Sequence, residues 1–288
     1  MLKTSTEIAS LSALVGERRA VEMIAKAGFD AWDFSLFDMC RWDWQSNRPK
    51  DLPHPLNGKE YLAFARELRH IGEECGIVCN QSHAPFPSAP MFEWLVRSIE
   101  CTAEAGGEIC IIHPVNTRSA EENAEMYEKL LPYAKDAGIK IATENMWNWN
   151  AEKDEAAPAA CSDPESFLAH LNAVNDLDLV ACLDLGHAEM RGLHTTAPEM
   201  IRALDKHLQA LHVHDNDKWH DNHQIPFSMD MDFDAIAEAL RDINYQGYIT
   251  LEANTYLNAY TKENAELGVR NLAESAKRLA AMVAGKSV

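Results

Sequence analysis

Short apolar runs alternate along the whole chain with longer segments that carry helical periodicity. We predict strands from the apolar runs at residues 3–10, 29–35, 77–83, 108–113, 139–144, 179–184, 209–214 and 247–252. After the first, each run is brief and rich in valine, isoleucine, phenylalanine, cysteine or alanine, which is typical of parallel strands buried on both faces. The alternation therefore predicts an α/β fold built on a parallel sheet.

The segments between these strands place apolar residues on one helical face. Clear examples are Phe92, Leu95, Val96, Ile99 and Ala103, and then Phe233, Ile236, Leu240 and Ile243. Asp163 precedes Pro164, which predicts an N-cap followed by a proline in the first helical position. Four glycines follow helical segments, where the turn into the next strand favours a positive φ angle. They are Gly28, Gly76, Gly138 and Gly247.

Eight strands with alternating helices in 288 residues fit one (β/α)8 TIM barrel, a single domain over residues 1–288, better than two domains. A doubly wound sheet is the alternative, but no G-x-G-x-x-G segment follows an early strand. Two long stretches, residues 36–57 and 147–162, follow strands and interrupt the alternation. We predict that both are ordered loops, which cover the barrel face where the strands end.

Metal-binding side chains recur near the ends of the predicted strands. Nine are notable: His83, His113, Glu144, Asp184, His187, His212, Asp221, His223 and Glu252. In a barrel of parallel strands, the C-terminal strand ends meet on one face and build the site. The pattern therefore predicts a metal site at the C-terminal ends of the strands.

Four of these residues, Glu144, Asp184, His212 and Glu252, come from the last four predicted strands. Carboxylates with one imidazole suit Mn²⁺, Mg²⁺, Co²⁺ or Zn²⁺, with coordination positions left for substrate oxygens. Any one of them alone could instead pair with an arginine. As a set, acidic residues at the ends of apolar strands are costly to bury without a cation, so we predict that these four bind the metal.

Each of the other candidate site residues allows two interpretations. His83 and His113 are either core imidazoles bonded to backbone carbonyls or residues that bind more metal or substrate. His187 follows Asp184 by three residues and would contact the substrate or a second metal. His214 shares a strand face with His212, and we favour His212 as the ligand and His214 as its support. Further candidates for substrate or additional metal lie in loops after strands: Trp147, Lys218, Asp221 and His223.

Composition narrows the range of partners. The chain has 26 basic and 45 acidic residues, a formal charge of −19, with no Lys/Arg-rich run, so nucleic acid is a disfavoured partner. The seven cysteines show no paired spacing typical of a zinc knuckle. No signal-peptide core or membrane-length apolar run is present, so we expect a cytoplasmic protein. Self-association into a homo-oligomer is possible, although no helix shows an unmistakable apolar interface.

The motifs HAPF, IHP, TEN, DLGH, HVHDND and LE occur in that order over residues 83–252. Together they resemble the xylose isomerase-like TIM barrel superfamily, which holds sugar isomerases and epimerases as well as endonuclease IV-type AP endonucleases. In the epimerase branch, the resemblance implies one divalent metal on Glu144, Asp184, His212 and Glu252. It also implies that Glu144 and Glu252 move protons, and that His187 and Lys218 contact substrate.

The resemblance does not select a branch. The endonuclease branch holds three zinc ions on a ligand pattern similar to all nine residues, although many sugar-branch members also carry the D-x-H of Asp221 and His223. Two departures bear on the substrate. The common P-G-x-G appears here as Pro226-Phe227-Ser228-Met229, and the carboxylate that ketose epimerases often have six positions after Glu144 is Asn150.

The leading hypothesis is a divalent-metal-dependent isomerase or epimerase of a sugar or related hydroxy-carbonyl compound. Carboxylate proton transfer would proceed through a metal-stabilised enediolate. The alternatives are a zinc-dependent AP endonuclease-like phosphodiesterase and a non-catalytic sugar-binding barrel. The sequence leaves open the exact substrate, its phosphorylation, the native metal and its number, which glutamate is the base, and the oligomeric state.

Overall fold

A curled parallel sheet lies at the centre of the molecule, in a computed structural model that describes residues 1–286. All eight predicted strands are present: β1 (Thr4–Thr6), β2 (Ala31–Ser35), β5 (Val78–His83), β6 (Ile109–Ile111), β7 (Lys140–Glu144), β10 (Leu179–Asp184), β11 (Leu208–His212) and β12 (Ile249–Leu251). Six of them form one parallel sheet in the order β11-β10-β7-β6-β5-β2, and β1 pairs in parallel with β12. The predicted α/β fold with a parallel sheet is confirmed.

The β1–β12 pair is linked to both edges of the six-stranded sheet. One parallel bridge joins Glu7, just after β1, to Asp33 of β2, and another joins Val213, just after β11, to Leu251 of β12. Backbone hydrogen bonds follow the same path, since Val213 N–H donates to Thr250 O at 2.9 Å. The curled sheet therefore has the β1–β12 pair lying along the gap between its two edge strands.

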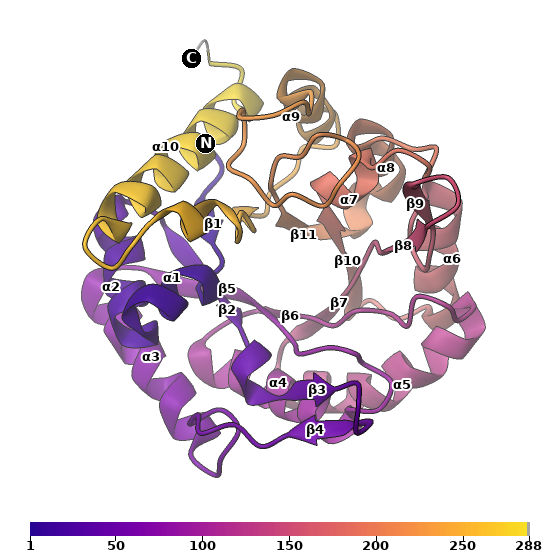
Figure 1. Cartoon of the computed structure of the whole chain (residues 1–288). Helices are drawn as coiled ribbons and strands as arrows, with labels where there is room; N and C mark the ends of the chain where they lie inside the picture. The colour runs from indigo at the N-terminus through magenta and orange to yellow at the C-terminus, as the bar shows by residue number, and fades with distance from the viewer. Residues whose placement is uncertain (287–288) are drawn as a thin grey trace.

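Helices surround the sheet (Figure 1). They are α1 (Ala9–Val15), α2 (Glu17–Ala27), α3 (Tyr61–Cys75), α4 (Phe92–Ala105), α5 (Ala120–Ala137), α6 (Pro164–Val174), α7 (Leu185–Glu189), α8 (Ala197–Leu204), α9 (Phe233–Asp242) and α10 (Ala265–Val283), with short 3-10 turns at Phe37–Met39, Asp205–His207 and Tyr256–Ala259. The larger helices contact one another in sequence from α2 to α10, and α10 returns to α2. The main hydrophobic core lies between this ring and the sheet. The predicted apolar helix faces pack against it, except that Phe92, at the start of α4, is exposed. Among the described residues, no helix is long and apolar enough to cross a membrane.

The helix ends bear out most of the local sequence signals. Asp163 caps α6 by accepting a hydrogen bond from Ser166 N–H at 2.9 Å. Three of the four selected glycines have left-handed φ angles, from 72° to 90°. The prediction for Gly247 was wrong, because the left-handed residue after α9 is Asn244, at φ 52°. Gly247 is needed for space instead, since a Cβ there would lie 2.9 Å from Gln209 O.

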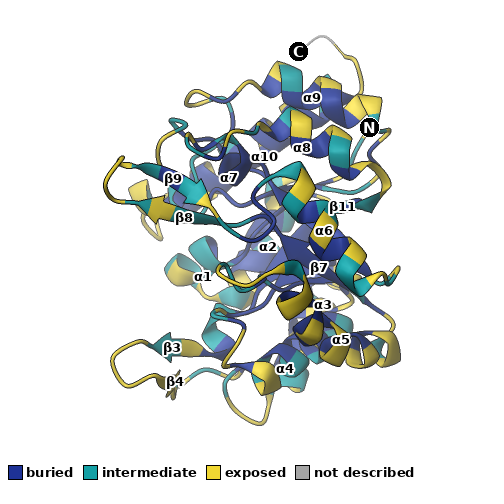
Figure 2. Cartoon of the chain, turned by 90° about the vertical axis from the view of Figure 1, so that its right-hand side faces the viewer, coloured by how far each residue is buried: buried dark blue, intermediate teal, exposed yellow. Residues whose placement is uncertain are grey.

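The two stretches predicted to be ordered loops each contain a β-hairpin, which the sequence did not reveal. Residues 36–57 contain β3 (Arg41–Asp43) paired with β4 (Arg48–Lys50), and residues 147–162 contain β8 (Trp147–Asn150) paired with β9 (Glu155–Pro158). Both hairpins are antiparallel, and both project from the same side of the molecule in Figure 2. The first hairpin follows β2 and the second follows β7, and backbone hydrogen bonds between the paired strands order both segments.

Candidate functional site

Strand alternation brings the candidate residues to the inside of the curled sheet. A small apolar cluster, separate from the main core, contains Ile111, Ala142, Val180, Cys182 and Ala210. Successive side chains of a strand point to opposite faces, so the residue two positions further on shares the same face. Two positions after these cluster residues come His113, Glu144, Asp184 and His212. These four side chains therefore lie next to the apolar cluster on the inside of the curled sheet, where they form a polar layer at the strand ends.

Glu144, Asp184, His212 and Glu252, called here the four-residue group, come together as predicted. One ligand atom from each lies within 4.8 Å of the others, and all four side chains are buried. His212 Nδ1 is 2.9 Å from Glu144 Oε1 and 3.6 Å from Glu252 Oε2. Asp184 Oδ2 is buried without a hydrogen-bond partner among the described residues. Buried carboxylate oxygens in this arrangement need positive charge, so the group fits a divalent cation.

Two further imidazoles approach the other oxygen of Glu144. His113 Nε2 lies 3.1 Å and His83 Nε2 3.6 Å from Glu144 Oε2. Burial lowers the pKa of His113, and the nearby His83 lowers it further. These two histidines are therefore not isolated core imidazoles, since both point at the carboxylate of the four-residue group.

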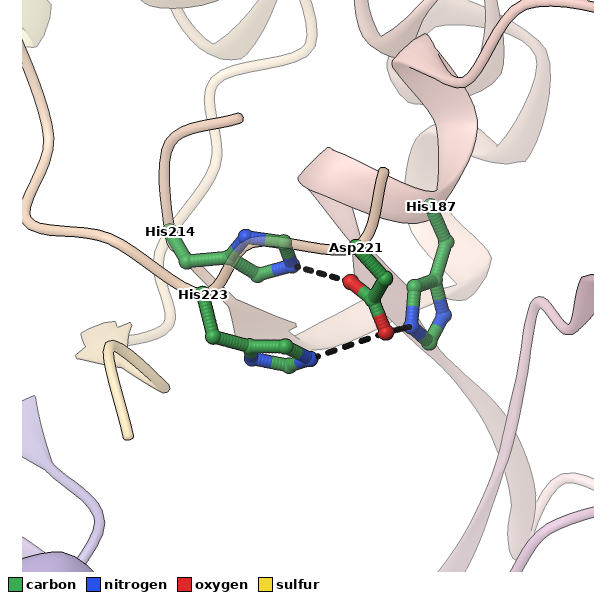
Figure 3. A group of neighbouring side chains, drawn as sticks. All are labelled: His187, His214, Asp221 and His223. Atoms are coloured by element: carbon green, nitrogen blue, oxygen red, sulfur yellow. Dashed lines mark hydrogen bonds and ion pairs between the residues drawn. The ribbon is translucent and has the colours of Figure 1, made fainter. Parts of the chain in front are cut away.

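A second set of side chains, His187, His214, Asp221 and His223, lies beside the first and is called here the loop group (Figure 3). Asp221 Oδ2 is 3.1 Å from His223 Nε2 and 3.2 Å from His187 Nε2. The rings of His214 and His223 stack with centroids 3.9 Å apart. His214 also links the two groups, because its Nε2 lies 3.0 Å from Asp184 Oδ1.

Backbone carbonyl groups fix the orientation of three of these imidazoles. The Nδ1 atoms of His83, His187 and His223 donate to the carbonyl oxygens of Ala84, Asn145 and Glu252, at 2.8, 2.8 and 2.7 Å. An Nδ1–H donor leaves Nε2 with a lone pair in the neutral ring. Each Nε2 faces a carboxylate oxygen, which is also an acceptor. A proton or a cation must therefore lie between the two acceptors, and this is the tautomer that metal-binding histidines commonly show.

Attraction between carboxylates and imidazoles outweighs burial at most groups of the site, but not at His113. Burial opposes the ionisation of Glu144, yet His212 holds its pKa well below the ordinary value. The same competition lowers the pKa of Asp184 to about 2, because imidazoles surround that carboxylate. Burial also opposes the charge of His223, but Asp221 raises its pKa to about 10. Without a metal, the site is therefore a network of carboxylates and imidazolium groups.

Sequence reasoning missed two supporting residues. Asp33 of β2 is buried, and its Oδ2 lies 3.3 Å from His212 Nε2, on the side of the ring opposite Glu144. Asn145 holds Asp184 through two backbone contacts, since its side chain accepts from Asp184 N–H at 2.8 Å and donates to Asp184 O at 2.9 Å. A signal existed for both, because Asp33 is a carboxylate inside an apolar run and Asn145 belongs to the TEN motif.

A cavity of about 1020 Å³ opens over these groups, and its lining includes Glu144, His187, Glu252 and Trp147. The Trp147 ring lies 6.4 Å from that of His187, so the predicted aromatic residue is next to the polar layer. Lys218 is not among the lining residues, and its Nζ lies 3.2 Å from Glu189 Oε2. The structure therefore brings together every predicted site residue except Lys218.

The segment that departs from the family pattern, Pro226-Phe227-Ser228-Met229, contains one residue in the left-handed conformation. Phe227 has a φ of 71°, a left-handed angle that a glycine adopts more easily. The carboxylate of Asp215 accepts hydrogen bonds from the N–H groups of Ser228, Met229 and Met231, at 2.9, 2.8 and 3.2 Å. The loop that follows His223 is thus held by Asp215 rather than by glycine flexibility.

Comparisons with known proteins agree with this architecture. An uncharacterised protein of Methanocaldococcus jannaschii is 25% identical over 283 residues, which cover 90% of this chain and 88% of that protein. Among solved structures, a D-tagatose 3-epimerase-like protein superimposes with a TM-score of 0.73 at 21% identity, covering 99% of both chains. An L-ribulose 3-epimerase gives 0.71 at 16% identity, covering 99% of this chain and 95% of the other.

A structure of the IolI protein with a bound zinc atom gives a TM-score of 0.69 at 16% identity, with 99% of both chains covered. At these identities the superpositions show a shared fold. The family described as the xylose isomerase-like TIM barrel matches residues 21–279, most of the chain. The resemblance drawn from the sequence motifs is confirmed: this chain belongs to the xylose isomerase-like TIM barrel family.

Proposed function

We propose that this chain is a divalent-metal-dependent isomerase or epimerase of a sugar or related hydroxy-carbonyl compound. The observation that carries the proposal is the four-residue group, whose ligand atoms lie within 4.8 Å of one another beside a large cavity. Its neighbours in fold include sugar epimerases, one of them solved in complex with D-allulose. Carboxylates and imidazoles around a small polar substrate are the groups that proton-transfer chemistry needs.

Glu144, Asp184, His212 and Glu252 would hold the metal ion, which we propose to be Mn²⁺, Zn²⁺, Mg²⁺ or Co²⁺. The three carboxylates and one imidazole fit such an ion, as does the unpartnered oxygen of Asp184. When bound, the ion polarises a carbonyl group and stabilises the negative charge that develops on its oxygen.

The proton transfers are assigned to Glu144 and Glu252. Both carboxylates line the cavity and approach the same nitrogen of His212, one from β7 and one from the end of β12. One would take the proton from the carbon beside the carbonyl group. The other would return a proton to the opposite face or to the neighbouring carbon. His83, His113 and His187 would then hydrogen-bond substrate hydroxyl groups, with Trp147 against the sugar ring.

We also propose that the β1–β12 pair completes an eight-stranded (β/α)8 barrel and that residues 1–288 act as a single domain. The bridges Glu7–Asp33 and Val213–Leu251 support this, as does the contact of α10 with α2. A closed barrel would hold the ends of β7, β10, β11 and β12 at fixed separations. This rigidity matters, because proton transfer depends on placing both carboxylates accurately.

The central test is deuterium exchange at carbon in D₂O, followed by NMR, with a panel of free and phosphorylated ketoses and protein of measured metal content. We expect exchange beside the carbonyl group with metal bound, and a fall of about 10²–10⁴-fold in Glu144→Gln and Glu252→Gln. Glu17→Gln is the control, since Glu17 pairs with His54 at 2.7 Å and does not line the cavity. Absence of exchange across the panel, or full exchange in both site variants, would overturn the proposal.

A zinc-dependent AP-site nuclease is the second candidate. The observation in its favour is the additional set of ligand groups: the loop group, and His83 with His113 around Glu144. The formal charge of −19 opposes binding to a phosphate backbone. Three zinc ions per chain, together with incision of an abasic duplex, would favour the nuclease. Tight sugar binding without exchange or incision would instead favour a non-catalytic sugar-binding barrel.

A further inference from the structure

The cavity above the polar groups is larger than a single sugar requires. Its volume is about 1020 Å³, and pockets for drug-sized ligands typically measure about 300–1000 Å³. The polar side chains occupy the part of the lining formed by strand ends. The rest of the wall comes mainly from the segments after β2, β5, β6 and β7, and most of its side chains are apolar.

Aromatic rings form one continuous wall from the polar layer outward. The Phe37 ring contacts the His83 ring edge-on, with centroids 4.8 Å apart. Phe37 also lies 5.8 Å from Phe86, which stacks on His113 at 5.5 Å. Phe86 is 53% exposed although it lines the cavity. A large apolar ring therefore stands next to the histidines with about half of its surface open to solvent.

The β3–β4 hairpin adds a second apolar surface. Trp42 and Trp44 of this hairpin line the cavity, and Trp44 is 72% exposed. Met146 and Trp147, which follow β7, contribute further apolar surface. Exposed aromatic side chains around a concave site are typical of ligand-binding surfaces, since covering them with an apolar group is favourable.

The same cavity offers little to a phosphate group. Among the described residues, Arg41 is the one lysine or arginine in the lining. Its guanidinium group is already bonded to Asp38 Oδ1, at 2.7 and 3.2 Å. Phosphate recognition commonly uses an arginine free to make two parallel hydrogen bonds, and Asp38 would also repel the anion.

We propose that the substrate has two parts: a hydroxy-carbonyl group that reaches the four-residue group, and an apolar ring substituent that lies against Phe86 and Trp44. It carries no phosphate. This inference rests on the proposed function for the first part and on the aromatic wall alone for the second. The ring would cover the exposed faces of Phe86 and Trp44, which a bare sugar would leave in water.

Three hydroxamates test the proposal, because they share one planar hydroxy-carbonyl head and differ only in the tail. They are acetohydroxamate, 3-phenylpropionohydroxamate and 3-phosphonopropionohydroxamate, and their dissociation constants are measured calorimetrically on the metal-loaded protein. We expect the phenyl compound to bind at least about tenfold more tightly than acetohydroxamate, from burial of the ring. The phosphonate should gain nothing.

Phe86→Ala and Trp44→Ala should each remove most of the gain from the phenyl tail and leave acetohydroxamate unchanged. Tyr133→Ala is the matched control, because Tyr133 is 45% exposed and does not line the cavity. If acetohydroxamate binds but the phenyl tail adds nothing, or the phosphonate binds most tightly, the two-part substrate is wrong and the proposed function stands. If only the phenyl compound binds, and Phe86→Ala weakens it, the apolar subsite stands without the metal-site chemistry. If none binds, both proposals fail.

Discussion

Gly186→Ala is the sharpest test of how the two groups are coupled. Gly186 lies in α7, immediately beside the ring of His214. A Cβ at this position would lie 2.0 Å from His214 Cε1 and 2.4 Å from its Nε2. Carbon atoms in contact are normally about 3.5–4.0 Å apart, so the ring would have to move by about 1.5 Å. That movement breaks the 3.0 Å contact between His214 Nε2 and Asp184 Oδ1.

The expected cost follows from this geometry. Overpacking of a filled interior costs about 1–3 kcal/mol, and loss of a partner that orients a ligand weakens metal binding by about 10–100-fold. Urea unfolding measures the first effect and calorimetric titration with Mn²⁺ the second. Gly58→Ala is the control, because its Cβ would lie 3.6 Å from Pro55 O, an ordinary contact. The double variant with His214→Ala should be no less stable than His214→Ala alone, since the clash is gone. Unchanged stability and metal affinity in Gly186→Ala would refute the coupling.

Three further predictions follow from buried charges. Asp33→Asn should weaken metal binding by about 10–100-fold in calorimetry, because Asp33 orients His212 at 3.3 Å; parental affinity would contradict this role. Metal binding should tighten from pH 6 to pH 8 and release protons, since His212 would bind as a neutral imidazole and, despite burial, the nearby Glu252 and Glu144 carboxylates hold its pKa well above the ordinary value. Heats independent of the buffer's ionisation enthalpy would exclude proton release. Burial raises the pKa of Glu7 from 4.5 to about 7, so the folded state binds a proton that the unfolded state releases, and the free energy of unfolding falls as pH rises from 4.5 to 7. The wild-type chain should lose about 3 kcal/mol of unfolding free energy between pH 4.5 and pH 8, measured by urea unfolding, and Glu7→Gln should remove this loss.

The strands and the four-residue group were predictable because one local rule governs both. Buried parallel strands are nearly continuous apolar runs, and residues two positions apart lie on the same face of the sheet. The polar residue at a strand end therefore points to the same side as the apolar residue two positions before it. Glu144 follows Ala142 and His212 follows Ala210 in this way, so the position of each side chain was encoded in its own strand. Their proximity followed from the barrel arrangement without knowledge of any distance.

The features that the sequence did not reveal are pairings that no periodic pattern marks. The β3–β4 hairpin pairs Trp42 with Pro49, and no alternating apolar pattern in this stretch marks it as a strand pair. The resemblance implied that Lys218 contacts substrate, and this stays a prediction; the 3.2 Å ion pair of its Nζ with Glu189 Oε2 was not foreseen. Asp33 was recognisable as a carboxylate inside an apolar run, but its contact with His212, 179 positions away, was not. Tertiary pairing of this kind leaves no periodic trace in a single sequence.

The charge balance of the two groups indicates which one binds a metal ion first. The four-residue group brings three carboxylates to one imidazole, whereas the loop group brings one carboxylate, Asp221, to three imidazoles. A divalent cation gains more from three negative ligands, particularly a carboxylate-preferring ion such as Mn²⁺ or Mg²⁺. The imidazole-rich loop group favours zinc, but it can also remain neutralised by a proton, since Asp221 lies within 3.2 Å of two histidines. Filling of the four-residue group alone would therefore leave the loop group free to hydrogen-bond a hydroxylated substrate, which is the arrangement that the proposed isomerisation would use.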